Sequence, residues 1–577
     1  MTSTTPKVRA IAYHLRSAIL IPAMAALATP LPSRAQRTSP DLIIYNAKVI
    51  TVDRNFSMVQ AAAVQNGMFV AVGSDADILS KAGPNTVRID INQRAMLPGF
   101  SDTHVHMLSG ATFPREVDLT EVRSVTEMQH AIAERAKTMK PGDWIPVSRG
   151  WWDYRLAERR NPTKEDLDDA APNNPVALQV THYSIVNSAA LHTGNITRDT
   201  PDPPGGEIGR DPKTGEPNGL LMDRASSLLR PPLEEVAPEQ AYNGVRAILA
   251  KMNSHGITSA RQPGGTLRDA ALFHKMYDDG NLTMRIDFCY TMNTSLRGRE
   301  LDDALDRLGQ PGQEYGKGTF RADCLAEVSL DGAAGITEFM RQDYPGRPGY
   351  RGLQMVKQDQ YNEFAIAAAK HGWRLAVHAG GDAAIDEALE AFEMAGANGR
   401  RWSLEHAISL RPDQYDRVKK NGLLINSQYA HNAEGGKKTL DGWGHEWSNQ
   451  TERYKDWLAH GIEFSAGSDG PISYRAEPLL WMYGMVTRDT EWGGSLAPDQ
   501  MITREQAIRS MTSISAKTSF EENIKGSIEP GKYADFVVLS KDILTVPDTE
   551  IKTTRVLATV LGGKTVYGDL KKAASAQ

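Results

Sequence analysis

The sequence predicts an α/β protein built on a TIM-like (β/α)8 barrel, for three reasons. Eight short apolar segments that suit β-strands recur along the chain and alternate with helix-like runs. Strand–helix alternation is typical of parallel strands joined by crossover helices, and eight such units suit a barrel. Further short strands stand near both ends of the chain, where each group lacks partners of its own. A doubly wound open sheet is the alternative architecture.

The predicted barrel covers residues 97–519. Its first strand is the apolar run 97–107, which ends in two histidines. The other seven strands are predicted at 256–261, 284–290, 323–330, 374–378, 402–406, 423–427 and 463–469. Helices are predicted before each of these, at 241–254, 267–277, 300–308, 360–370, 384–394, 411–420 and 452–458.

Two further regions complete the predicted organisation. Short strands in 41–96 and 520–570 predict one composite β-sandwich module made from the N- and C-terminal segments. Residues 113–235 predict a long insertion after strand one, with an extended loop in the Pro-, Gly- and Asp-rich stretch 200–218. Irregular segments of this length in compact proteins usually form lids or functional insertions.

The first 35 residues predict a secretory signal peptide. Basic residues precede the apolar run 18–31, and the small residues Ser33 and Ala35 follow it. The run is shorter than the about 20 residues of a membrane-spanning helix. A disordered or membrane-anchored N-terminus is the alternative. We expect an exported protein, periplasmic or secreted, with no membrane association after cleavage.

The amino-acid composition limits the classes of binding partner that we expect. The net charge of −6 gives no basic excess, which argues against a nucleic-acid partner. The expected partner is a small-molecule substrate. A homo-oligomer is left open. The two cysteines, Cys289 and Cys324, lie in neighbouring predicted strands. We interpret them as two buried thiols, although a disulfide between such strands is geometrically feasible.

Side chains that bind metals collect at the ends of the predicted strands. His104 and His106 are two residues apart, so on a strand they share one face and can reach one point. In a (β/α)8 barrel the C-terminal strand ends form the active site. A single such residue is more often structural, but their repetition on five strands predicts a metal site. The further candidates are Glu327, His378, His406 and Asp469.

These motifs in their order resemble the metal-dependent amidohydrolase superfamily and, within it, the YtcJ-like branch (amidohydrolase family 3). The resemblance covers about residues 41–570. The matching segments are 97–106, Val186 to Leu191, Asp331-Gly332, Val377 to Asp382, Leu404 to Ala407, Gly467 to Pro471 and Gly526 to Asp535.

The resemblance implies a ligand set. His104 and His106 would bind a first metal together with Asp469, and His378 and His406 would bind a second. In many relatives a carboxylated lysine bridges the two metals, whereas Glu327 takes that position here. One or two Zn²⁺ ions, or other divalent ions, are compatible with this set.

The implied mechanism assigns two catalytic residues. Asp469 would take a proton from water and pass it to the leaving nitrogen, and His182 in the insertion would stabilise the oxyanion. A structural role is the alternative for His182. Asp382 and Glu405 would support the ligand histidines, with surface or helix-cap roles as their alternative.

Aromatic residues are the candidates for substrate binding. Their rings would suit a flat or apolar acyl or aryl group. Packing of the insertion onto the barrel is the alternative for each. The candidates are Trp151, Trp152, Tyr183, Tyr290 and Tyr429.

The sequence thus predicts an exported metal-dependent hydrolase that cleaves an amide, N-acyl or cyclic amide C–N bond. An ester or lactone hydrolase with the same metal site is one alternative. A non-catalytic metal-binding protein of the envelope is another. The substrate itself is not predicted, because a fold does not fix a function.

Overall fold

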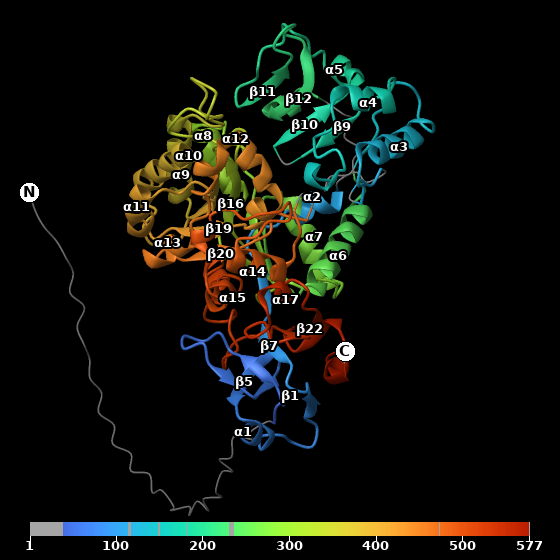
Figure 1. Ribbon diagram of the computed structural model, residues 1–577. Coiled ribbons are helices and arrows are strands. Elements are labelled where there is room, and N and C mark those ends of the chain that lie inside the picture. The colour runs from blue at the N-terminus through green and yellow to red at the C-terminus, as the bar shows by residue number, and fades with distance from the viewer. Residues whose placement is uncertain are drawn as a thin grey trace, which may run out of the picture. The chain divides into compact units, whose positions relative to one another are not determined.

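The computed structural model describes residues 39–112, 117–119, 121–147, 151–180, 182–229, 236–471 and 474–575 (Figure 1). The predicted signal peptide lies outside these residues. A search of the described helices finds none with the length and apolar character needed to cross a membrane.

Eight parallel strands form the central sheet, which confirms the predicted barrel. Each strand pairs in parallel with the next one around the barrel. In chain order the strands are β8 (Phe100–Asp102), β13 (Ile257–Pro263), β14 (Arg285–Tyr290), β16 (Phe320–Ser329), β17 (Arg374–Ala379), β18 (Ser403–His406), β19 (Leu424–Ser427) and β20 (Phe464–Ala466).

The first and last strands meet, which excludes the open-sheet alternative. The backbone N–H of Thr103 donates to the carbonyl of Ala466 at 3.3 Å, and that of Asp469 donates to His104 at 2.8 Å. Buried Asp102 strengthens this contact, because its carboxylate accepts the hydroxyl of Ser468 at 2.6 Å. The ends of strands one and eight are therefore held together where the metal-binding candidates lie.

Helices cover the outside of the barrel and bury one face each. In α9, Tyr361, Phe364 and Ala368 recur at three- and four-residue spacing and are buried. The barrel helices are α6 (Pro238–Ser254), α7 (Leu267–Asp278), α8 (Gly298–Arg307), α9 (Gln358–Lys370), α10 (Asp382–Met394), α11 (Tyr415–Lys420) and α13 (Tyr454–Ala459), followed by α14 (Pro478–Thr487), α15 (Arg504–Ser510) and α16 (Ser513–Thr518).

Strands from both ends of the chain share one sheet. In Figure 1 the red strand β22 and the blue strand β7 belong to this module. One apolar cluster, with residues such as Ile44, Phe69 and Val538, joins the two sheets of the module. The first sheet has the order β5-β4-β1-β6, with β1 (Leu42–Tyr45), β4 (Ala61–Gln65), β5 (Met68–Gly73) and β6 (Val87–Asp90). The second sheet has the order β23-β22-β21-β7-β2-β3, with β2 (Lys48–Ile50), β3 (Met58–Val59), β7 (Ala95–Pro98), β21 (Phe536–Leu539), β22 (Val556–Leu561) and β23 (Lys564–Gly568).

The first barrel strand is shorter than predicted. Leu97 pairs with Val537 of β21, so it belongs to the module sheet, and the barrel strand begins at Phe100. Gly99 lies between the two strands, where a Cβ atom would be 2.1 Å from the Thr258 hydroxyl oxygen. His104 and His106 follow the end of β8 rather than forming its last residues.

The insertion has its own secondary structure and its own apolar clusters. The predicted extended loop 200–218 contains a hairpin strand instead, because β11 pairs antiparallel with β12. The described elements are α3 (Val125–Ala136), α4 (Lys164–Ala170), α5 (Ser188–Thr193), β9 (Ala177–Gln179), β10 (Tyr183–Val186), β11 (Gly206–Arg210) and β12 (Pro217–Asp223), with the four strands in the order β11-β12-β10-β9.

The two cysteines form a disulfide. Cys289 on β14 and Cys324 on β16 are directly paired across the sheet and are fully buried. The interpretation as two separate thiols is therefore wrong, because the register of these parallel strands places the two side chains opposite each other.

A buried ion pair connects the barrel to the terminal module. Arg285 on β14 donates to both carboxylate oxygens of Asp535, at 2.6 and 3.0 Å. The Arg285 guanidinium also lies 3.6 Å from the centre of the Tyr533 ring. Asp535 further accepts the backbone N–H of Gly562 at 2.7 Å. Both charged side chains are almost fully buried, so each depends on the other for compensation.

We expect Asp535→Ala to lower the free energy of unfolding by about 3–5 kcal/mol, because it leaves the buried Arg285 charge unpaired. Chemical denaturation followed by circular dichroism measures this. Asp441→Ala is the control, since it removes an exposed ion pair with Lys437. Equal stability of the two variants would contradict the structural role of the buried pair.

Candidate metal centre

The carboxylate of Glu327 lies at the centre of the site, between two pairs of histidines. It follows the middle of β16, and its Oε1 lies 3.2 Å from His378 Nδ1 and 2.8 Å from His406 Nε2. Its Oε2 lies 3.4 Å from His104 Nε2 and 3.7 Å from His106 Nε2. One carboxylate oxygen therefore faces each pair.

A second carboxylate faces the first pair of histidines. Asp469 follows β20, and its Oδ1 lies 3.0 Å from His106 Nε2 and 3.7 Å from His104 Nε2. Its Oδ2 lies 3.1 Å from Nε2 of His431, a residue that the sequence analysis did not select. All six predicted ligands are thus brought together at one end of the barrel.

Two of these residues adopt an uncommon backbone conformation. His406 has φ 69° and Asp469 has φ 55°, in the left-handed region that residues other than glycine rarely adopt. Such conformations persist where the surrounding structure fixes them, and they cluster at functional sites.

A buried polar network orients His104. Its Nδ1 lies 2.7 Å from Glu405 Oε2. Glu405 in turn accepts hydrogen bonds from Ser403 at 2.6 Å and Asn426 at 2.8 Å, and Arg261 lies 3.4 Å from it. Because Glu405 fixes Nδ1, the Nε2 atom of His104 is turned towards Glu327 and Asp469.

Hydrogen-bond partners orient the second pair of histidines, His378 and His406, in the same way. Nδ1 of His406 lies 2.7 Å from the side-chain oxygen of Gln428, which leaves Nε2 facing Glu327. Nε2 of His378 donates to the Gly332 carbonyl at 3.2 Å, which leaves Nδ1 facing Glu327. Asp331 lies 3.5 Å from the same Nε2 and accepts backbone N–H groups of Gly380 and Gly381 at 3.0 and 2.7 Å.

The donor atoms fit a divalent cation. Nε2 of His104 is buried without a hydrogen-bond partner among the described groups. Imidazole and carboxylate donors are typical zinc ligands, and a hydrogen bond on the other ring nitrogen is the usual support. Within each of three sets the donor atoms lie within 4.8 Å of one another: His104, Glu327 and His406; His104, His106 and Asp469; and His406, His431 and Asp469.

Both central carboxylates favour the anionic form although Asp469 is buried and Glu327 is largely buried. Burial raises the pKa of Glu327, but the charge of His104 and hydrogen bonds from the surrounding histidines lower it well below its ordinary value. Burial also raises the pKa of Asp469, and hydrogen bonds from His106 and His431 lower it well below its ordinary value. The site therefore keeps the negative charge that a cation requires.

His182 reaches the site from the insertion. Its Nδ1 lies 2.8 Å from Asp223 Oδ1, and Asp223 ends β12. The His182 ring is 5.2 Å from the His378 ring. One pocket containing His182 also reaches His378, His406 and Asp469, and a second reaches Glu327 and Asp331.

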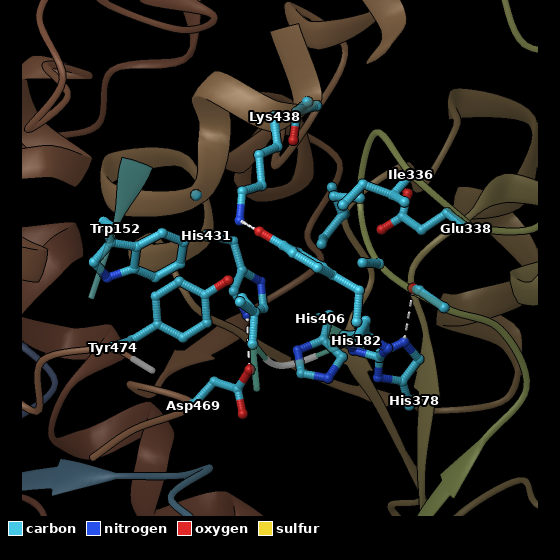
Figure 2. Close-up of a pocket in the computed structure, with 18 residues that line it drawn as sticks. Trp152, His182, Ile336, Glu338, His378, His406, His431, Lys438, Asp469 and Tyr474 are labelled. Atoms are coloured by element: carbon cyan, nitrogen blue, oxygen red, sulfur yellow. Dashed lines mark hydrogen bonds and ion pairs between the residues drawn. The ribbon is translucent and has the colours of Figure 1, made fainter. Parts of the chain in front are cut away.

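The pocket in Figure 2 has a wall of aromatic rings. Trp152 and Tyr183 of the insertion line it, as does Tyr474 of the barrel. The Trp152 and Tyr474 rings are 5.3 Å apart, and the Tyr474 and His431 rings are 5.0 Å apart. Lys438 of α12 (Gly436–Ser448) points into the same pocket.

Three of the aromatic residues predicted to bind substrate lie outside this pocket. Trp151 is buried in an apolar cluster of the insertion. Tyr290 is buried 5.8 Å from the Trp373 ring, and Tyr429 is buried with its hydroxyl donating to the Asp489 carbonyl at 3.1 Å. None of the three lines either pocket described above, because core packing uses their rings.

The two support candidates differ. Glu405 contacts a ligand histidine directly, as described above. Asp382 instead accepts the Arg341 backbone N–H at 2.8 Å and the Arg411 guanidinium at 3.3 Å. Its role is therefore to hold loops near the start of α10.

The residues that the sequence analysis missed are Gln428, His431, Lys438 and Tyr474. His431 follows β19, one of the three barrel strands for which no metal-binding residue was selected. The rule that selected the other histidines, a ligand soon after a strand end, would have found it. Gln428 directly follows β19, but an amide is not a typical zinc ligand and gave no signal. Lys438 and Tyr474 carry no strand-end signal, because a helix and a loop bring them to the pocket.

A buried carboxyl group supports the turn that presents His431. His431 begins the π-helical turn η4 (His431–Gly435). Its neighbour Asn432 donates to Glu452 Oε2 at 2.7 Å, and Glu452 is fully buried. Burial raises the pKa of Glu452 to about 8, although the charge of Arg488 opposes this.

We expect Glu452→Gln to reduce the pH dependence of stability. The folded protein holds the Glu452 proton up to about pH 8, whereas an unfolded glutamate releases it near 4.5. The contribution of the protonated group to stability is complete below pH 4.5 and is lost as the pH rises to about 8. The melting temperatures of both proteins at about pH 5 and about pH 8 measure this. Parallel losses in the two proteins would contradict the assignment.

Comparison with known proteins places the chain in a family. A model described as "Amidohydrolase family" matches residues 88–567. The chain is 29% identical over 554 residues to N-substituted formamide deformylase of Arthrobacter pascens, covering 91% of this chain and 98% of the relative. It is 28% identical over 517 residues to the putative amidohydrolase YtcJ of Bacillus subtilis, covering 88% and 96%.

Solved structures share the fold. An uncharacterised metal-dependent hydrolase from Pyrococcus furiosus superposes with a TM-score of 0.66 at 23% identity, covering 87% of this chain and 100% of that one. A mutant of the atrazine chlorohydrolase TrzN from Arthrobacter aurescens, complexed with zinc and atraton, gives a TM-score of 0.52 at 16% identity, covering 92% and 98%. The chain therefore belongs to the amidohydrolase family, metal-dependent hydrolases that act on carbon–nitrogen bonds.

Proposed function

We propose that this protein hydrolyses a C–N bond of an amide, N-acyl or cyclic amide substrate at a zinc centre. The position of the Glu327 carboxylate between two pairs of histidines carries the proposal. The deformylase relative, whose name denotes removal of a formyl group from nitrogen, supports the choice of an amide.

The site would hold one or two cations. His104, His106 and Asp469 would bind the first, His378 and His406 the second, and Glu327 would contribute one oxygen to each. A bound divalent cation lowers the pKa of a coordinated water from 15.7 towards about 7 and polarises a carbonyl group.

Asp469 is the proposed general acid and base. It lines the pocket as well as facing the ligand histidines. Its carboxylate would accept a proton from the attacking water and pass it to the leaving nitrogen, which otherwise departs as a poor anionic leaving group. His431, 3.1 Å from Asp469 Oδ2, would hold this carboxylate in place.

His182 is the proposed stabiliser of the oxyanion that forms as water adds to the carbonyl carbon. Asp223 holds one ring nitrogen and thereby fixes the direction of the other. A protonated ring could donate from that second nitrogen to the developing negative charge. Since His182 comes from the insertion, this donor is separate from the barrel ligands.

We further propose that the protein is exported, on the composition of residues 1–35. A mature N-terminus near Gln36 in protein recovered from the periplasm or medium would support export. An intact Met1 on cytoplasmic protein would oppose it.

Metal removal tests the central proposal. We expect chelation to abolish hydrolysis of a panel of N-formyl, N-acyl and cyclic amides, and Zn²⁺ to restore it. Elemental analysis of the same samples gives the number of ions per chain. Turnover that survives complete metal loss would overturn the proposal. Matched esters and lactones in the panel distinguish the ester alternative, which predicts turnover of these compounds alone.

Two substitutions test the catalytic assignments. We expect Asp469→Asn to lower kcat by about 10²–10⁴-fold, because the amide side chain cannot accept the proton. His182→Gln should lower kcat by about 10²–10³-fold with metal content unchanged. If the protein binds metal without catalysis, the unmodified protein itself would show no turnover of any compound in the panel. Full kcat in either variant would remove that residue from the mechanism.

A further inference from the structure

We propose that Lys438, Trp152 and Tyr183 form a subsite for a carboxylate group of the substrate. This inference rests on the proposed function and narrows it. The substrate class would be an amide that carries a carboxylate away from its scissile bond, such as an N-acyl amino acid.

The ammonium of Lys438 lies in an aromatic cage. Its Nζ is 5.0 Å from the centre of the Trp152 ring and 4.4 Å from that of Tyr183. It also donates a hydrogen bond to the Tyr183 hydroxyl, which in turn lies 3.4 Å from the side-chain oxygen of Asn161. Two rings and a hydroxyl from the insertion therefore hold one lysine of the barrel in a fixed position.

The Lys438 ammonium has N–H donors that no described group accepts. A lysine ammonium carries three N–H donors, and within the described chain Lys438 uses one of them, for Tyr183. No described carboxylate forms an ion pair with it, and the charge that acts on it from further away is that of Asp153. Burial lowers the pKa of Lys438 to about 8, and the charge of Asp153 opposes this only in part. A ligand carboxylate would supply the directly paired anion that the described side chains do not.

The subsite is separated from the metal ligands by the length of the pocket. In Figure 2 Lys438 lies across the pocket from Asp469 and His406. Successive rings connect the two ends: His406 to His431 at 5.0 Å, His431 to Tyr474 at 5.0 Å, and Tyr474 to Trp152 at 5.3 Å. A scissile group at the metal ligands therefore leaves the remote end of the substrate near Lys438.

The remaining walls suit the body of such a substrate. Ala333, Ala334 and Ile336 provide apolar surface on the pocket wall. The other acidic side chain on the wall, Glu338, is fully buried, and burial together with Asp331 raises its pKa well above the ordinary value. This shift favours the neutral form of Glu338, which does not repel an anionic ligand.

Calorimetric binding to the zinc-loaded full-length protein tests the subsite without turnover. The probes are 3-phenylpropanoate and the neutral 3-phenylpropan-1-ol. We expect Lys438→Met to weaken binding of the carboxylate about 10- to 100-fold, as for loss of a charged hydrogen bond, and to leave binding of the alcohol unchanged. Lys438→Arg should retain most of the preference for the carboxylate.

Lys437→Met is the matched control. Lys437 is the neighbour of Lys438 in the sequence, but it is exposed and already paired with Asp441. It should bind both probes as the unmodified protein does. Equal carboxylate affinity in Lys438→Met and the unmodified protein, with unchanged melting temperatures, would overturn the subsite. Binding of the carboxylate at the metal alone would give that result, and it too would overturn the subsite.

Turnover gives the second readout. With an N-acyl amino acid and its C-terminal amide as paired substrates, Lys438→Met should raise KM about 10-fold or more for the carboxylate form only and leave kcat largely unchanged. A loss that is equal for both substrates would contradict a role in recognition. Absence of hydrolysis in the unmodified protein would contradict the proposed function, while the binding result would still decide the subsite.

Discussion

The structure depends on one largely buried charge, the carboxylate of Glu327, whose side chain is 13% exposed. A buried anion is costly unless opposite charge or hydrogen bonds compensate it. Here imidazoles from distant parts of the chain compensate the charge. His104 lies 223 residues before Glu327, and His406 lies 79 residues after it. The parallel barrel makes this convergence geometrically simple, because the C-terminal ends of all its strands meet at one rim.

The surrounding network explains why the imidazoles face inward. Glu405, Gln428 and the Gly332 carbonyl each bind one nitrogen of a different ligand histidine and thereby turn the other nitrogen towards the central carboxylates. Asp102 and Ser468 close the barrel beside these residues. The ligand positions are therefore fixed by hydrogen bonds that connect neighbouring strands, and a cation would enter a site that is already formed.

Chemistry and recognition come from different parts of the chain. The barrel contributes the metal-binding candidates, whereas the insertion contributes His182, Trp152 and Tyr183 to the pocket. Ligand positions set by strands tolerate little change, because each depends on the barrel register. Walls built by an inserted segment can differ between relatives without disturbing the metal centre. This division explains how one fold can serve many substrates.

The sequence by itself determined the barrel, its strand order and the six ligand candidates, because strand periodicity and residues at strand ends are local signals. It did not determine the hairpin in the insertion, the Cys289–Cys324 disulfide or the burial of Tyr290 and Tyr429, since these depend on which segments pair and pack. Lys438 is the clearest case. In the sequence it is one of two adjacent lysines in a polar segment for which no helix was predicted, and only the tertiary structure places it, unlike Lys437, between two aromatic rings of a distant segment.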